Sequence, residues 1–187
     1  WHFLAFYYCD SNGVNILTAH LFMQPKNGET LEEPEGERPI RIGNADMIYT
    51  DTIPPQIQYT ALGHLHGFKN IGSEENPIVY ASSPLSYSFS EAGQQKYVVV
   101  VEVAPDQRPS FEKIPLTQGK PLARKSFDNV PHALEWLREN PNTWVELTLE
   151  LKEYLKAQER KQLYSTHEGI VFLIPKMSWE LGKSPSG

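Results

Sequence analysis

Residues 59–66, YTALGHLH, organise the interpretation of this chain, because they join a short apolar run to the pattern Gly-His-X-His. The apolar run predicts a buried strand. Alternate side chains of a strand lie on the same side, so His64 and His66 are expected to face one pocket at its carboxyl end. Gly63 gives the backbone freedom to turn, or to approach a ligand closely, where the strand stops. Since imidazole is the commonest metal-binding side chain, the stretch predicts part of a metal site.

A third histidine ends another predicted strand, which covers residues 14–19 and stops at His20. Further strands are predicted at residues 77–81, 97–103 and 110–116, the last two as an antiparallel pair. Runs buried on both faces are typical of a sheet covered by other layers, and ligands bind beyond the carboxyl ends of such strands. His20, His64 and His66 are therefore candidate ligands of one metal ion, or of two ions about 3.5–4 Å apart as in phosphoester-cleaving sites.

The alternative for each histidine is a structural role, in which hydrogen bonds hold the ring. This alternative is stronger for His20 alone than for His64 and His66, because packing does not require two imidazoles so close in the sequence. No carboxylate motif of a two-metal site accompanies them, since the sequence contains no Asp-X-His, Gly-Asp-X-X-Asp or Gly-Asn-His-Asp. The metal site is therefore expected to be incomplete in this chain.

The later part of the chain has a different pattern of predicted strands and helices, which begins after a boundary signal at residues 119–121. Its predicted elements are a strand at 122–127, a helix at 131–140, a strand at 144–151, a helix at 154–164 and a strand at 169–175. This order predicts a small sheet with two helices on one face. Asn129 or Asp128 is expected to cap the first helix, and Glu146 and Glu150 are expected to lie in water.

Three other segments carry predictions of their own. Residues 1–9 are too apolar for exposure and predict the tail of a helix or an edge strand. Residues 24–39 hold five glutamates and few apolar side chains, which predicts a solvent loop. Residues 85–95 form a serine-rich connection with Phe89 as its expected anchor. Since the chain opens without methionine inside an apolar run, we expect an excised part of a longer protein.

Composition and charge exclude several classes of protein. The chain has 187 residues, is 40% hydrophobic and carries a net charge of −6, which is ordinary for a globular protein and gives no basic footprint for nucleic acid. Residues 96–125 hold six basic and three acidic side chains, which form either a local basic patch or a solvated surface. No apolar run is long enough to span a membrane. The single cysteine, Cys9, excludes an internal disulfide and fits the cytoplasm.

Several motifs resemble a known family of enzymes. Residues 18–20 (TAH) and 61–66 (ALGHLH) resemble the last two motifs of the calcineurin-like metallophosphoesterases. Residues 80–96 (YASSPLSYSFSEAGQQK), followed by the valine-rich strand, are similar to the SbcD family, the nuclease subunits of bacterial SbcCD complexes. Residues 37–43 fit the connection between the two histidine motifs in that family. The resemblance covers residues 14–175.

The resemblance implies an α/β fold in two parts. Residues 1–118 would be the C-terminal half of a calcineurin-like phosphoesterase β-sandwich with flanking helices, and residues 119–187 a small α/β capping domain. By the same resemblance His20 and His64 would bind one manganese ion and His66 the other. The remaining ligands and the transition-state histidine belong to motifs nearer the N-terminus, which this sequence does not contain. No catalytic residue is therefore expected within it.

The resemblance also implies a function for the full-length protein. It would be a manganese-dependent, two-metal DNA exonuclease and endonuclease of double-strand-break repair and recombination. It would act in the cytoplasm, away from membranes, on double-stranded DNA, as a homodimer with an SbcC-type ATPase. The fragment alone is expected to be inactive. Candidate contacts to the DNA backbone are Lys96, Lys120, Arg124 and Lys125.

Two other functions remain open at this point. One alternative to the nuclease is a non-catalytic module that binds DNA or a partner protein, and the other is a phosphodiesterase of another calcineurin-like branch. The second alternative keeps the histidines but leaves residues 80–96 and the capping unit unexplained.

Overall fold

A computed structural model describes residues 1–26, 31 and 48–177 and divides the chain into two units. Unit 1 consists of Trp1–Ser90 with Gln94–Thr117, and unit 2 of Glu91–Gly93 with Gln118–Gly187. Helices and strands occur in both, so the predicted α/β class is confirmed. None of the helices in the described part of the chain has the length and hydropathy that crossing a bilayer requires.

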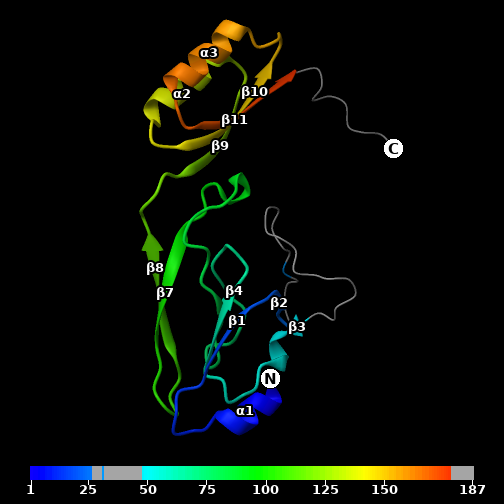
Figure 1. Ribbon diagram of the computed structural model, residues 1–187, viewed down its shortest axis with the longest axis vertical. Coiled ribbons are helices and arrows are strands. Elements are labelled where there is room, and N and C mark those ends of the chain that lie inside the picture. The colour runs from blue at the N-terminus through cyan, green and yellow to red at the C-terminus, as the bar shows by residue number, and fades with distance from the viewer. Residues whose placement is uncertain (27–30, 32–47, 178–187) are drawn as a thin grey trace, which may run out of the picture. The chain divides into compact units, whose positions relative to one another are not determined.

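The main sheet of unit 1 has four strands in the order β1-β4-β6-β5, of which Figure 1 labels β1 and β4. Their bounds are Ile16–His20 for β1, Tyr59–Gly63 for β4, Lys69–Asn70 for β5 and Ile78–Tyr80 for β6. Strands β1, β4 and β6 are parallel, with His20 opposite Gly63 and Leu62 opposite Tyr80. Their carboxyl ends therefore lie at one edge of the sheet, and the segments that follow them are brought together there.

The core of unit 1 lies beside this edge. Its buried side chains are Phe22, Met23, Leu31, Leu62, Leu65, Ile78 and Tyr80. The prediction that the strand before His20 is buried on both faces is wrong, because β1 alternates between exposed and half-buried positions and Ile16 is 48% exposed. Within the described residues β1 is an edge strand that pairs with β4, so it lacks a neighbour on its other side.

Two short pairs of strands complete unit 1. Strands β2 (Met23–Gln24) and β3 (Ile48–Tyr49) are parallel, whereas β7 (Lys96–Glu102) and β8 (Ser110–Leu116) form the predicted antiparallel pair. Aromatic contacts link the β7–β8 pair to the main sheet and the loop beside it. The ring centroids of Phe111 and Tyr59 are 6.3 Å apart, and those of Tyr97 and Phe68 are 5.8 Å apart. Burial raises the pKa of the Tyr59 phenol.

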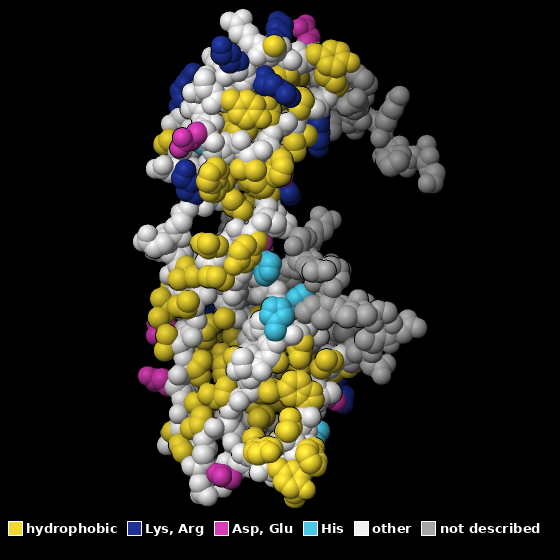
Figure 2. Space-filling view, viewed as in Figure 1, with side chains coloured by type: hydrophobic (Ala, Val, Ile, Leu, Met, Phe, Trp, Pro, Cys, Tyr) yellow, Lys and Arg dark blue, Asp and Glu magenta, His cyan; other side chains and the backbone are white. Residues whose placement is uncertain are grey.

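Two predicted segments of unit 1 differ from expectation. Helix α1 (His2–Tyr8) buries only Ala5, so the prediction that residues 1–9 are too apolar for exposure is wrong. Figure 2 shows hydrophobic side chains on the surface of unit 1. The predicted solvent loop at 24–39 falls mostly outside the described residues, and the motif at 37–43 falls entirely outside them. Inside that loop, however, Gln24 and Leu31 are buried and exchange two hydrogen bonds of 2.7 Å.

The serine-rich connection leads from β6 to β7 through a short helical turn. Single turns of 3₁₀ helix lie at Thr50–Thr52 (η1) and Phe89–Glu91 (η2). Phe89, the expected anchor of the connection, is half-buried, and the buried member of its turn is Glu91. The turn therefore has a polar residue at its most buried point.

Unit 2 has the predicted alternation of strands and helices. Its elements are β9 (Leu122–Phe127), α2 (Val130–Glu139), β10 (Trp144–Leu151), α3 (Ala157–Thr166) and β11 (Ile170–Met177). The strands are parallel in the order β11-β10-β9. Because crossovers between parallel strands are right-handed, two crossovers in the same direction put both helices on one face, as Figure 1 shows.

The core of unit 2 lies between these helices and the sheet. Its main contributors are Ala133, Leu134 and Leu137 of α2, as predicted, and Val145, Leu147, Leu149 and Leu151 of β10. The other face of β10 holds Glu146 and Glu150, which were expected in water but are half-buried. Neighbouring β9 explains this, since Arg124 Nε lies 2.5 Å from Glu146, and the Ser126 hydroxyl donates to Glu150 at 2.9 Å.

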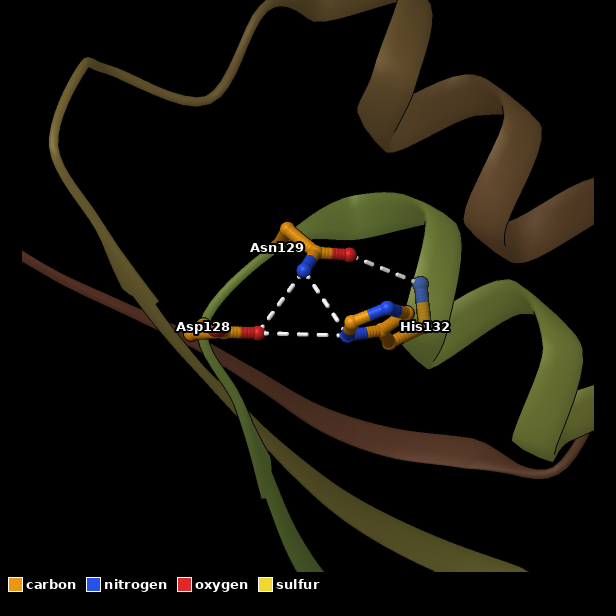
Figure 3. A network of polar contacts seen from close by, with 3 residues as sticks. All are labelled: Asp128, Asn129 and His132. Carbon is orange, nitrogen blue, oxygen red and sulfur yellow. Dashed lines mark hydrogen bonds and ion pairs between the residues drawn. The ribbon is translucent and has the colours of Figure 1, made fainter.

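The start of helix α2 is capped as predicted (Figure 3). The side-chain oxygen of Asn129 accepts the backbone N–H of His132 at 2.8 Å. The Asn129 amide nitrogen lies 2.8 Å from both the Asp128 carboxylate and the His132 ring. The second helix begins at Ala157, three residues later than predicted, because the Glu159 carboxylate accepts the Lys156 N–H at 2.9 Å and sets its start there.

Candidate metal centre

Two of the three candidate histidines lie side by side at the carboxyl edge of the main sheet. His20 is the last residue of β1, and His64 directly follows β4. The register places His20 opposite Gly63, so the two rings approach to 5.8 Å between centroids at an angle of 69°. Figure 2 shows histidine side chains close together on one face of unit 1. The sheet therefore joins two imidazoles that lie far apart in the sequence.

Gly63 is required for this approach. A β-carbon at position 63 would lie 2.8 Å from Nδ1 of His20, which is closer than real contacts allow. Its role is thus to leave space for a neighbouring imidazole. A turn or the close approach of a ligand was predicted at Gly63, and the close approach in the structure is made by His20.

His64 has an unusual backbone conformation. Its φ is 117°, a value that residues other than glycine rarely adopt. The residue is also buried, at 8% exposure, and its ring centroid lies 5.9 Å from that of Phe22. Such strain clusters at functional sites, where surrounding structure enforces it. Strand β4 ends before this residue, so the alternation that predicted one pocket for His64 and His66 does not extend over them.

His66 is held through its backbone. Its carbonyl oxygen accepts from Lys96 Nζ at 2.8 Å and from the Ser83 N–H at 3.2 Å, with the Ser83 hydroxyl at 3.5 Å. The ring of His66 lies 5.4 Å from that of Tyr87. These roles of Ser83 and Lys96 were not predicted, because no local pattern reveals which carbonyl a distant side chain reaches.

Tyr80 fixes the segment that follows His20. Its hydroxyl accepts the Met23 N–H at 2.9 Å and donates to the Leu21 carbonyl at 3.0 Å. Tyr80 is fully buried, so these bonds anchor the backbone next to His20 from within the core. This role was not predicted either; a tyrosine ending an otherwise apolar buried strand was the only available signal.

The three candidate histidines offer imidazole nitrogens, which are ligands of transition-metal ions in proteins. His20 and His64 bring two imidazole rings to within 5.8 Å of each other, whereas the ring of His66 lies beside that of Tyr87. Among the described residues, no group of three or more histidine, cysteine, aspartate or glutamate side chains is arranged to hold a metal ion. The described residues therefore contain two neighbouring imidazoles, His20 and His64, without a third such side chain beside them.

The four candidate DNA-binding cations do not form one patch. Lys96 belongs to unit 1 and is 6% exposed. In unit 2, Lys120 Nζ lies 4.6 Å from the Trp144 ring and 3.8 Å from the Glu168 carboxylate. Arg124 pairs with Glu146 on the face of the sheet that the two helices do not cover. Its neighbour in β9, Lys125, lies on the opposite face, with Nζ 5.4 Å from the Trp136 ring of α2.

Comparisons with known proteins relate the chain to one nuclease component. No family model matches the sequence. The D subunit of the SbcCD nuclease from Bacillus subtilis (strain 168) is 31% identical over 168 residues, which are 88% of this chain and 42% of the relative. The corresponding subunit from Escherichia coli (strain K12) is 33% identical over 129 residues, which are 66% of this chain and 32% of the relative. The chain thus spans less than half the length of both relatives.

Proposed function

We propose, since this chain is homologous to part of the D subunit of the SbcCD nuclease, that it supplies one half of a two-metal phosphodiesterase centre. The observation that carries the proposal is the pair of imidazoles, His20 and His64, at aligned strand ends 5.8 Å apart. In this proposal residues 1–118 are the C-terminal half of a calcineurin-like phosphoesterase domain. Residues 119–187 are its capping domain.

The histidines have distinct roles in the proposed centre. His20 and His64 would hold one manganese ion through ring nitrogens, and His66 would hold the other. A bound pair of ions would supply an activated water and stabilise charge on the phosphoryl oxygens. The protein's own contribution is to orient the rings: Gly63 admits His20, and Tyr80 anchors the backbone beside it. Ligands from the remainder of an SbcD-type protein would complete both ion sites.

The partners follow from the same homology. We propose that the complete protein acts on double-stranded DNA in break repair and recombination, as a cytoplasmic homodimer with an SbcC-type ATPase. Lys120, Arg124 and Lys125 of unit 2 are the proposed contacts to the DNA backbone. Because Arg124 and Lys125 lie on opposite faces of the sheet, they would contact DNA at separate points. Lys96 has a buried ammonium that donates to a backbone carbonyl, which supports a role inside the protein instead.

The test uses a chimera, because the chain spans 42% of the Bacillus subtilis relative. This chain replaces its aligned region in that relative, and manganese-dependent cleavage of linear double-stranded DNA is measured. Cleavage is expected in the chimera and is expected to be lost in His64→Ala and His66→Ala. His132→Ala is the matched control, since this exposed histidine lies at the cap of α2 and should leave cleavage unchanged.

Three results would contradict the proposal. Full cleavage by folded His64→Ala and His66→Ala chimeras would remove the histidines from the centre. Binding of DNA without cleavage or manganese dependence would favour a non-catalytic binding module. Hydrolysis of small phosphodiesters without DNA cleavage would favour a phosphodiesterase of another calcineurin-like branch. The 187-residue chain alone is expected to show no cleavage above its own His64→Ala variant.

A further inference from the structure

We infer that Lys96 is a positioning residue of the proposed metal centre. Its ammonium donates to the carbonyl oxygen of His66 at 2.8 Å and thereby holds the segment that carries His64 and His66. The role of Lys96 in metal binding rests on the proposed function. The hydrogen bond from Lys96 to the His66 carbonyl does not depend on that function. Lys96 touches no reacting group in this assignment; it acts through the backbone of His66.

The burial of Lys96 is the first argument. The side chain is 6% exposed, although lysine is almost never fully buried without a partner. A methionine or leucine would fill the same space without desolvating a charge. The ammonium also lies 3.3 Å from the side-chain oxygen of Gln94. A lysine at this position is therefore explained by what its N–H groups bind, not by packing.

The second argument is that three segments meet at the His66 carbonyl. The loop after β4 contributes the carbonyl, the turn after β6 contributes the Ser83 N–H at 3.2 Å, and the start of β7 contributes Lys96. The turn is itself tied to β7, because the Ser82 hydroxyl oxygen accepts the Tyr97 N–H at 2.9 Å. Ser82 has a φ of 88°, so this turn is bent sharply where it meets β7.

The consequence concerns the ion proposed for His66. Ligands of a metal must be held close to their binding geometry by supporting hydrogen bonds, and loss of such support typically weakens metal affinity about 10–100-fold. Lys96 holds the backbone of His66 directly, whereas the backbone that follows His20 is anchored by the Tyr80 hydroxyl. Removing Lys96 should therefore weaken the His66 ion more than the ion between His20 and His64.

The first experiment needs no metal. In the 187-residue chain, Lys96→Met removes the donor, and amide hydrogen exchange at Ser83 and the His66 ring signals are followed by NMR. Faster exchange of the Ser83 amide and displaced His66 signals are expected, with restoration by Lys96→Arg. Lys113→Met is the matched control, because this lysine lies on β8 with Nζ 4.5 Å from the Phe68 ring. If Lys96→Met does not fold, Lys96→Gln takes its place, with a smaller change expected.

The second experiment measures manganese binding to the chimera by electron paramagnetic resonance. Lys96→Met should weaken one of two bound ions about 10–100-fold, with Lys96→Arg restoring it and Lys113→Met without effect. Two equally tight ions and unchanged His66 signals in Lys96→Met would overturn the inference and leave the proposed function standing. A chimera that binds no manganese even with Lys96 present would overturn the proposed function and the metal role of Lys96 together. Loosening of the loop would still be seen in the first experiment.

Discussion

His64 combines burial, backbone strain and a neighbouring imidazole at a single residue. Its φ of 117° is a conformation that glycine adopts readily and histidine does not. A site selected for stability alone would place glycine there. This chain has histidine there instead, with its ring 5.8 Å from that of His20, which is consistent with ligand binding as the reason for the strain.

The first prediction distinguishes the effect of the His64 backbone conformation on stability from the effect of its ring. His64→Ala and His64→Gly both remove the imidazole, but only glycine relieves the positive φ. Relief of about 1–3 kcal/mol exceeds the entropic penalty of glycine, about 0.4–1 kcal/mol. We therefore expect His64→Gly to be more stable to urea unfolding than His64→Ala by about 1 kcal/mol. If His64→Gly is instead less stable than His64→Ala by about 0.4–1 kcal/mol, which is the entropic penalty of glycine alone, the backbone at this position carries no strain.

At the scale of elements, short-range capping and long-range pairing contribute differently. Helix α2 begins where Asn129 caps it, and the cause lies within four residues of sequence (Figure 3). The surroundings of strand β10 depend on its neighbour β9, whose register places Arg124 opposite Glu146 and whose Ser126 hydroxyl reaches Glu150. The first kind of feature was predicted from the sequence, and the second was not.

The second prediction tests the cap of α2. Asn129→Ala leaves the backbone N–H of His132 without its acceptor and should destabilise unit 2 by about 1 kcal/mol. His132→Ala removes only the ring, because the cap uses the backbone of that residue, and should have a smaller effect. Thermal unfolding followed by circular dichroism measures both. A larger loss in His132→Ala than in Asn129→Ala would mean that the ring contacts, not the cap, hold the start of the helix.

At the scale of the whole molecule, the chain is organised as two units with separate cores. The last strand of unit 1, β8, ends at Leu116, and the first strand of unit 2, β9, begins at Leu122. Exposed residues connect them. We propose that this connection is the boundary between the phosphoesterase half-domain and the capping domain.

The third prediction concerns that boundary. Exposed connections between cores are the preferred sites of proteolytic cleavage. Limited digestion with a protease of broad specificity should cut within residues 117–121 and leave a resistant fragment that contains β9 to β11. Mass spectrometry identifies the fragment. Digestion that removes β9 or α2 before the connection is cut would contradict two independently stable cores.

Local patterns were sufficient for features whose cause is local. They predicted the cap at Asn129, the alternation of strands and helices in unit 2, the antiparallel pair β7–β8 and the resemblance to SbcD. Capping, hydrophobic periodicity and short motifs act over a few residues, so one sequence contains them in full. The same patterns failed for β1, whose apolar residues predicted burial that an edge position does not provide.

Three-dimensional packing alone established how the candidate site is supported. Residues that lie far apart in sequence meet there: His20 with Gly63, Tyr80 with Leu21, and Lys96 with the His66 carbonyl 30 residues away. Strand register and the reach of buried side chains set these contacts, and neither is encoded in a short pattern. The sequence thus identified the histidines as candidate ligands. The tertiary structure places His20 beside His64, because the parallel strands β1 and β4 end at one edge of the sheet. It also places the Lys96 ammonium within hydrogen-bonding distance of the His66 carbonyl.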